Sequence, residues 1–105
     1  MKEIDVKTLK EMIDKGEDFQ LIDVREQNER DFANIGGEFI PMNTVPQNVS
    51  KIATDKKVII HCRSGKRSAN IVQYLEQNHK LDNLYNLKGG ILAWSDEIDP
   101  EVPKY

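Results

Sequence analysis

Apolar residues follow two patterns that alternate along the chain. Short apolar runs predict β-strands at residues 19–24, 39–41, 57–61 and 84–87. Between these runs, apolar residues three or four positions apart predict helices at residues 6–15, 45–52, 68–78 and 91–98. Strands that alternate with helices indicate an α/β domain with a mostly parallel sheet, in which ligands bind beyond the carboxyl ends of the strands.

Local signals refine these boundaries. Asp5 suits the N-terminal cap of the first helix, and Gly16 suits its end. The charged residues 25–32 are predicted to be helical, with Glu29 on a solvated face. Residues 99–105 contain two prolines and are predicted to form an irregular surface segment.

Length and composition narrow the class of protein. With 105 residues, we expect one domain spanning residues 1–105. The net charge of −3 argues against a nucleic-acid partner. A single cysteine cannot form an internal disulfide, and no stretch has the length and character of a signal peptide or a membrane span. We therefore expect a cytoplasmic protein with no membrane partner.

The most informative stretch is HCRSGKRS, residues 61–68, which contains the only cysteine. A predicted strand delivers Cys62 to the carboxyl end of the sheet, and a helix begins a few residues later. Gly65 allows the tight turn between them, so that backbone N–H groups can point inward as an anion nest. Together with Arg63, Lys66 and Arg67, these groups are expected to lower the pKa of the thiol and favour the reactive thiolate.

Two other interpretations of Cys62 compete with this one. A lone cysteine is often an inert core residue, but the polar residues that follow Cys62 argue against a core position. Cysteine-dependent phosphatases place five residues between the cysteine and a phosphate-binding arginine. Here Ser68 occupies that place, and Arg67 comes after only four residues. The shorter loop favours a persulfide on Cys62 over a phosphoenzyme.

With these residues in view, the chain resembles the single-domain rhodaneses, which are sulfurtransferases, over almost its whole length. Three stretches carry the resemblance: LIDVRE at residues 21–26, CRSGKRS at 62–68, and LKGG at 87–90 followed by Trp94. The resemblance implies a five-stranded parallel sheet flanked by helices. It also implies that Cys62 takes sulfur from a small anionic donor such as thiosulfate and passes it to cyanide in vitro, or to a thiol or protein in the cell. No metal or organic cofactor is implied.

The resemblance also assigns expected roles. Cys62 matches the sulfur-carrying nucleophile, and Asp23 and Arg25 match a supporting segment. Gly89 and Gly90 are expected either to pack closely on the loop or to form a pocket wall. The residues expected to bind the donor or hold the persulfide are Arg63, Ser64, Gly65, Lys66, Arg67 and Ser68.

Two points limit the transfer of roles. His61 adjoins Cys62, but adjacent strand residues point to opposite faces, so we expect it not to reach the thiol. Many family members carry a His-Ile-Pro-Gly-Ala run where this chain has Asn34-Ile35-Gly36-Gly37-Glu38, so any role of that histidine is absent here. Two alternatives stay open, namely a carrier module that receives persulfide sulfur from a partner protein, and a small phosphatase or arsenate reductase.

Overall fold

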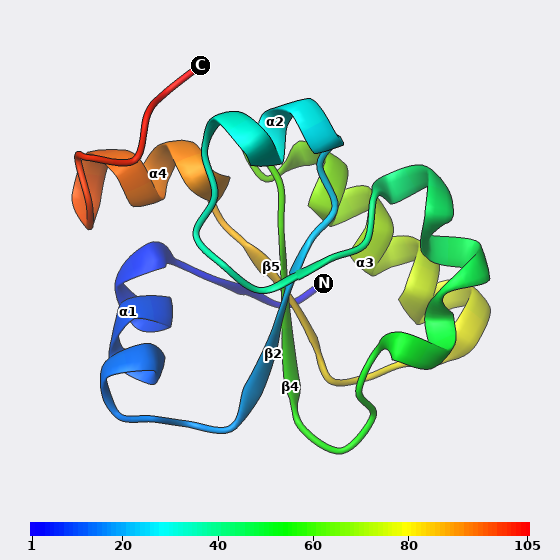
Figure 1. The fold of residues 1–105 in the computed structure, drawn as a ribbon. Coiled ribbons are helices and arrows are strands. Elements are labelled where there is room, and N and C mark those ends of the chain that lie inside the picture. Colours follow the sequence, from blue (N-terminus) through cyan, green and yellow to red (C-terminus); the bar gives the residue numbers. More distant parts are fainter.

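A five-stranded sheet forms the centre of the structure, a computed structural model that describes residues 1–105 (Figure 1). The strands are β1 (Glu3–Ile4), β2 (Phe19–Asp23), β3 (Glu38–Phe39), β4 (Lys57–His61) and β5 (Leu84–Leu87). Their order is β1-β5-β4-β2-β3, and every neighbouring pair is parallel. The predicted α/β fold with a five-stranded parallel sheet is therefore confirmed.

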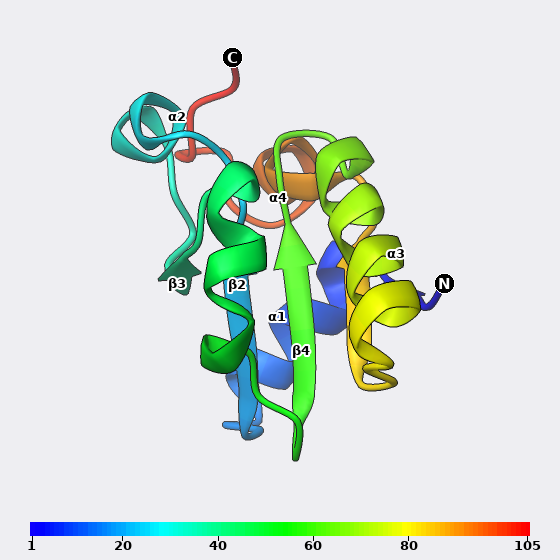
Figure 2. The ribbon, with the colours of Figure 1, turned by 90° about the vertical axis from the view of Figure 1, so that its right-hand side faces the viewer.

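Helices cover both faces of this sheet. They are α1 (Val6–Asp14), α2 (Gln27–Phe32), α3 (Lys66–His79), α4 (Gly90–Glu97) and the 3₁₀ helices η1 (Met42–Gln47) and η2 (Val49–Lys51). Helices α1 and α4 lie on one face, α3 and the 3₁₀ helices lie on the other, and α2 lies above the carboxyl ends of the strands (Figures 1 and 2). None of these helices has the length and apolar character needed to cross a bilayer.

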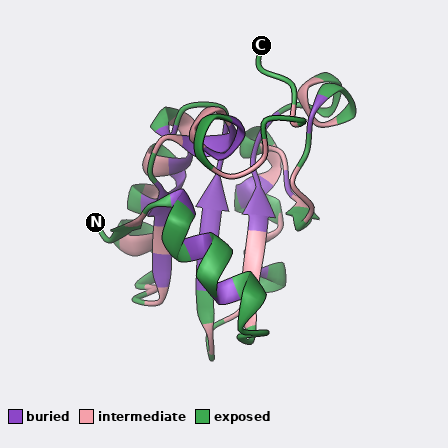
Figure 3. Cartoon of the chain, turned by 90° about the vertical axis from the view of Figure 1, so that its left-hand side faces the viewer, coloured by how far each residue is buried: buried purple, intermediate pink, exposed green.

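Strand β4 lies in the middle of the core. Val58, Ile59 and Ile60 are completely buried, and their side chains alternate between the faces. Val58 and Ile60 join a cluster that includes Leu75 of α3, whereas Ile59 joins the cluster beneath α1 and α4. Figure 3 shows the strands largely buried behind helices whose outer surfaces are exposed. The strand that leads to Cys62 is thus fixed from both sides.

The sequence prediction differs from the structure at several points, including β3, which spans Glu38–Phe39 rather than residues 39–41. The helix predicted at residues 45–52 is replaced by η1 and η2. The helical turns already begin at Met42, and an α-helix starting there would need an N–H at Pro46 to bond the Met42 carbonyl. Val45 and Ile52 are nevertheless buried, as their spacing indicated. The two-residue strand β1 was not predicted, and α3 begins at Lys66, two residues before the predicted start.

Candidate active site

Cys62 stands at the carboxyl end of the central strand, between β4 and the N-terminus of α3. Gly65 caps α3 with a φ of 99°, in the left-handed region that favours glycine, and this turn folds the loop back over the sulfur. The cysteine has an exposed fraction of 0% and belongs to the same apolar cluster as Val58 and Ile60. Its burial alone would suit an inert residue, so the polar groups around the sulfur decide what it can do.

Hydrogen-bond donors surround the Cys62 sulfur. The Gly65 N–H donates to Sγ at 3.1 Å, and the Ser68 hydroxyl lies 3.4 Å from the same atom. Burial works to raise the pKa of the Cys62 thiol. The Ser68 hydroxyl and the backbone N–H groups of Ser68, Gly65 and Ser64 outweigh that effect, so the pKa lies below its ordinary value. The loop therefore stabilises a buried thiolate.

Helix α4 holds the loop in the orientation that aims these donors. The backbone N–H of Ile91 donates to the Cys62 carbonyl at 3.0 Å, and that of Leu92 donates to the Arg63 carbonyl at 3.1 Å. In a planar trans peptide the C=O of one residue and the N–H of the next point in opposite directions. Turning the Arg63 carbonyl toward α4 therefore turns the Ser64 N–H away from α4, toward the sulfur.

The two glycines before α4 have different surroundings. A Cβ on Gly90 would lie 2.4 Å from the Arg63 carbonyl oxygen and 2.6 Å from that of Cys62, so Gly90 provides close packing on the loop. Gly89 instead contributes to a groove of about 360 Å³ beside the loop, whose other lining residues include Lys66. Of the two predicted roles, packing thus describes Gly90 and a pocket wall describes Gly89.

Asn86 of β5 is a buried polar residue that was not predicted from the sequence to belong to the site. Its Oδ1 lies 2.5 Å from the Ser68 hydroxyl, whose single proton can go either to this oxygen or to Cys62 Sγ, and its Nδ2 donates to the Gly65 carbonyl at 3.1 Å. Asn86 therefore fixes two of the residues that contact the Cys62 sulfur. An asparagine inside an otherwise apolar strand was the signal available in the sequence.

The three cations of the loop do not surround the sulfur as expected. Arg67 donates from both Nη atoms to the Glu29 carboxylate at 2.7 Å, and Arg63 donates to the backbone oxygen of Tyr105. Lys66 has no ion-pair partner. The largest effects that lower the thiol pKa come from the Ser68 hydroxyl and the backbone N–H groups rather than from the three cations. Arg67 alone has a resolved interaction with the sulfur, since the negative charge of Cys62 helps to raise the pKa of Arg67.

The prediction of a solvated face for Glu29 was also wrong. Its side chain has an exposed fraction of only 12% and forms the bidentate ion pair with Arg67. The hydrogen bonds from Arg67 lower the pKa of Glu29 to about 2. The partners are 38 residues apart in sequence, so helix periodicity alone could not reveal the pair.

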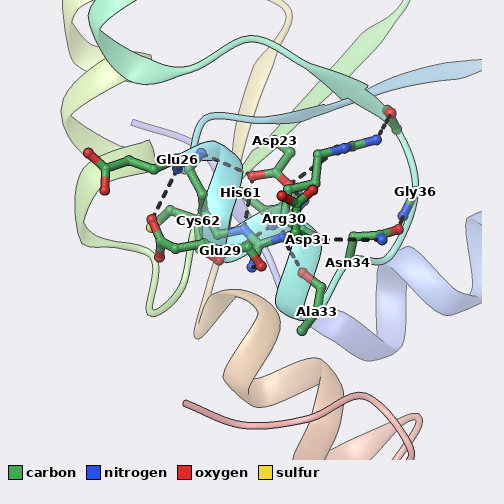
Figure 4. A network of polar contacts seen from close by, with 12 residues as sticks. Asp23, Glu26, Glu29, Arg30, Asp31, Ala33, Asn34, Gly36, His61 and Cys62 are labelled. Atoms are coloured by element: carbon green, nitrogen blue, oxygen red, sulfur yellow. Dashed lines mark hydrogen bonds and ion pairs between the residues drawn. The ribbon is translucent and has the colours of Figure 1, made fainter.

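Asp23 and Arg25, which were predicted to form a supporting segment, make an ion pair, and both are completely buried. The guanidinium donates to Asp23 through Nε at 3.0 Å and Nη2 at 2.9 Å, and Nη2 also binds the Ala33 carbonyl at the end of α2. Figure 4 shows Asp23 and Ala33 in the network of polar contacts that also includes His61 and Cys62. The pair thus positions α2 and, with it, Glu29.

His61 belongs to this network rather than to the sulfur site. Its Nε2 lies 3.9 Å from Asp23 Oδ2, and its Nδ1 lies 3.4 Å from the backbone oxygen of Cys62. Burial lowers the pKa of His61 to about 4, against the opposing effect of Asp23, so the ring is neutral at pH 7. These contacts agree with the expectation that the His61 imidazole does not reach the Cys62 thiol.

A second cavity lies on the α2 side of the loop. It has a volume of about 230 Å³, and its lining includes Val24, Glu26, Met42 and Arg67. The largest cavity, of about 470 Å³, lies near the start of β2, away from Cys62. The two smaller cavities flank the loop of Cys62 and are therefore the relevant ones for chemistry.

Comparisons with known proteins agree with this geometry. The family model described as "Rhodanese-like domain" matches residues 5–97. "Putative sulfurtransferase YtwF" of Bacillus subtilis is 39% identical over 103 residues, covering 96% of this chain and 97% of that protein. A "Sulfurtransferase" of Allochromatium vinosum is 36% identical over 96 residues, covering 90% and 89%. The chain spans only 25% to 30% of some longer relatives.

The fold has close counterparts among solved structures. The crystal structure of a rhodanese-like domain protein from Staphylococcus aureus matches with a TM-score of 0.84 and 33% sequence identity. The match covers 100% of this chain and 99% of that one. The similarity therefore extends over the sheet, both helical layers and the loop after β4.

Proposed function

This chain belongs to the rhodanese-like domain family, and from this premise we propose that it is a sulfurtransferase that carries sulfur as a persulfide on Cys62. The observation that carries the proposal is the ring of donors around the sulfur, with the Gly65 N–H at 3.1 Å and the Ser68 hydroxyl at 3.4 Å. Such donors stabilise an anionic sulfur whether it is a thiolate or a persulfide.

The proposed reaction has two steps. The Cys62 thiolate attacks the outer sulfur of thiosulfate, a new S–S bond forms, and the S–S bond of the donor breaks so that sulfite leaves with the electron pair. A nucleophilic acceptor, cyanide in vitro or a thiolate in the cell, then attacks the outer sulfur of the persulfide and releases the Cys62 thiolate. No proton has to move when both nucleophiles, the Cys62 thiolate and the acceptor, are anionic, and the groups that contact the Cys62 sulfur are the Gly65 N–H and the Ser68 hydroxyl rather than a general base.

Intact mass spectrometry tests the proposal directly. Reduced protein incubated with thiosulfate is expected to gain the mass of one sulfur atom, and cyanide is expected to remove that atom as thiocyanate. Cys62→Ser is the control and should show neither change. If the native chain forms no sulfur adduct and produces no thiocyanate, the proposal is wrong.

A carrier role is the second candidate, and the ion pairs favour it. Arg67 is paired with Glu29 and Arg63 is bound to Tyr105, so Lys66 is the loop cation left for a small dianion. Cys62 has no exposed surface, so a donor reaches Sγ only after rim side chains move. A protein or thiol persulfide could supply the energy for that movement through a larger contact area. Such exchange requires a reduced thiol, so we place the protein in a reducing compartment such as the cytoplasm.

Donor competition separates the two candidates. Purified protein is offered thiosulfate or a cysteine desulfurase that carries a persulfide, and the rate of persulfide formation on Cys62 is measured. A much larger kcat/KM for the desulfurase supports the carrier role, whereas rapid thiosulfate turnover with no transfer from the desulfurase discards it.

The phosphatase alternative is disfavoured because Arg67 is committed to Glu29. Hydrolysis of p-nitrophenyl phosphate that disappears in Cys62→Ser would restore it.

A further inference from the structure

The segment after α4, residues 102–105, returns to the loop that contains Cys62. We refer to it as the tail. The Ser95 hydroxyl of α4 donates to the Val102 carbonyl at 2.7 Å, and Lys104 forms an ion pair with Asp96. Figure 2 shows the tail (red) running from α4 toward α2. The tail therefore has defined contacts that place its last residue, Tyr105.

Tyr105 engages the first cation of the loop. The Arg63 Nε donates to the Tyr105 backbone oxygen at 2.6 Å, and Arg63 Nη2 donates to the same oxygen. The Arg63 guanidinium also lies over the tyrosine ring, 5.1 Å from its centroid. The Nε–Nη2 edge of a guanidinium is one that binds the oxygens of an anion. In this structure the Tyr105 oxygen occupies the position on Arg63 that an oxyanion would take.

The tyrosine side chain anchors that oxygen. Its hydroxyl accepts a hydrogen bond from Arg25 Nη1 at 3.0 Å and donates to Glu29 Oε2 at 2.7 Å. Its ring also packs edge-on against Phe32, with the ring centroids 5.9 Å apart. Tyr105 therefore joins the buried Arg25 and the Glu29 carboxylate to Arg63, which lies in the loop after β4.

We propose that Tyr105 is a specificity-determining residue, which holds Arg63 on the tail and so weakens the binding of doubly charged sulfur donors relative to singly charged ones. The inference rests on the proposed sulfurtransferase function. Tyr105 acts through Arg63, which directly follows Cys62 in the loop, and it does not touch the sulfur itself. An Arg63 released from the tail would offer a bidentate donor edge to the leaving oxyanion of the donor.

Two donors of different charge make the test specific. Thiosulfate carries two negative charges, whereas methanethiosulfonate carries one and releases methanesulfinate in the same displacement. The KM and kcat for both donors are measured for the native chain, Tyr105→Ala, Arg63→Ala and the double variant. Tyr105→Ala should lower the KM for thiosulfate about 3- to 10-fold, as one added charge-assisted contact would, with little change in kcat. The KM for methanethiosulfonate should change less than about 2-fold.

The Arg63→Ala background supplies the control. If Tyr105 acts through Arg63, then adding Tyr105→Ala to Arg63→Ala leaves the ratio of the two KM values unchanged. An unchanged ratio in Tyr105→Ala alone, or an equal change with and without Arg63, overturns the inference. Should Tyr105→Ala not fold, Tyr105→Phe decides, because it loses only the hydroxyl bonds to Arg25 and Glu29 and should shift the ratio in the same direction.

The proposed function and this inference fail in different ways. Absence of a sulfur adduct on the native chain with either donor would contradict the function. An adduct that forms normally, with a KM ratio insensitive to Tyr105, would contradict only the role of Tyr105.

Discussion

Replacing Gly90 with alanine tests whether close packing of α4 on the loop controls the reactivity of Cys62. The new Cβ would stand 2.4 Å from the Arg63 carbonyl oxygen and 2.6 Å from the Cys62 carbonyl oxygen. Both are backbone atoms, so no flexible side chain can move aside. Gly16 offers a matched control, because it also has a positive φ, 66° against 58° for Gly90, but a Cβ there would meet nothing within 4 Å.

The two substitutions should differ clearly in their effect on stability. Each places a side chain in the left-handed region, which costs about 1–2 kcal/mol. Up to about 1 kcal/mol of this cost is offset, because alanine gives the unfolded chain less conformational freedom than glycine does. At Gly90 the overlap also breaks the hydrogen bonds from Ile91 and Leu92 to the loop, worth about 1 kcal/mol each, and adds overpacking of about 1–3 kcal/mol. We expect a loss of about 4 kcal/mol for Gly90→Ala, against about 1 kcal/mol for Gly16→Ala.

Denaturant unfolding followed by Trp94 fluorescence measures the free energy, since Trp94 is the only tryptophan and is buried in α4. The rate of Cys62 alkylation as a function of pH measures the thiol pKa in the same samples. Gly90→Ala should raise that pKa, because the Ser64 N–H is no longer aimed at the sulfur, whereas Gly16→Ala should leave it unchanged. Equal stability losses in the two variants, or an unaltered thiol pKa in Gly90→Ala, would refute the packing argument.

Three further predictions concern charged and polar groups. Glu29→Gln should destabilise the fold by about 1–2 kcal/mol at pH 7. Because the pKa of Glu29 falls from 4.5 to about 2 on folding, this difference from the native chain should be complete above pH 4.5 and vanish as the pH falls through 2 in acid-unfolding measurements. Ser68→Ala should raise the Cys62 pKa and slow alkylation at pH 7 about 5-fold, since one hydrogen bond to the thiolate is lost. The pKa of His61 falls from 6.5 to about 4 on folding, so the unfolded chain binds the proton first. The free energy of unfolding should therefore decrease below pH 6.5 by up to about 1.4 kcal/mol per pH unit until pH 4, and a flat profile in calorimetry would contradict the burial of a neutral imidazole.

Local patterns were sufficient to place Cys62 but not its surroundings. The apolar run before it predicted β4, and Gly65 predicted the turn, because both signals lie within a few residues of the cysteine. The Arg67–Glu29 pair and the contacts of Tyr105 with Arg63 depend on how distant segments meet at the carboxyl end of the sheet. Contacts between segments this far apart in the chain leave no periodic pattern in the sequence. The tail was accordingly predicted as surface chain, and its irregular backbone is confirmed while its contacts were missed.

The positions of the cations and of the backbone N–H groups explain which of them stabilise the negative charge of the Cys62 thiolate. A cation at the rim faces water, where its interaction with the sulfur is screened, and here Arg63 and Arg67 have other partners. Backbone N–H groups inside the loop are buried with the sulfur and cannot turn away while α4 holds the carbonyls of Cys62 and Arg63. Their dipoles are thus aligned before any charge develops, so little reorganisation is needed when the thiolate forms. Because the thiolate does not depend on Arg63, this residue can serve the proposed selection among donors, and that selection depends on how firmly Tyr105 retains Arg63.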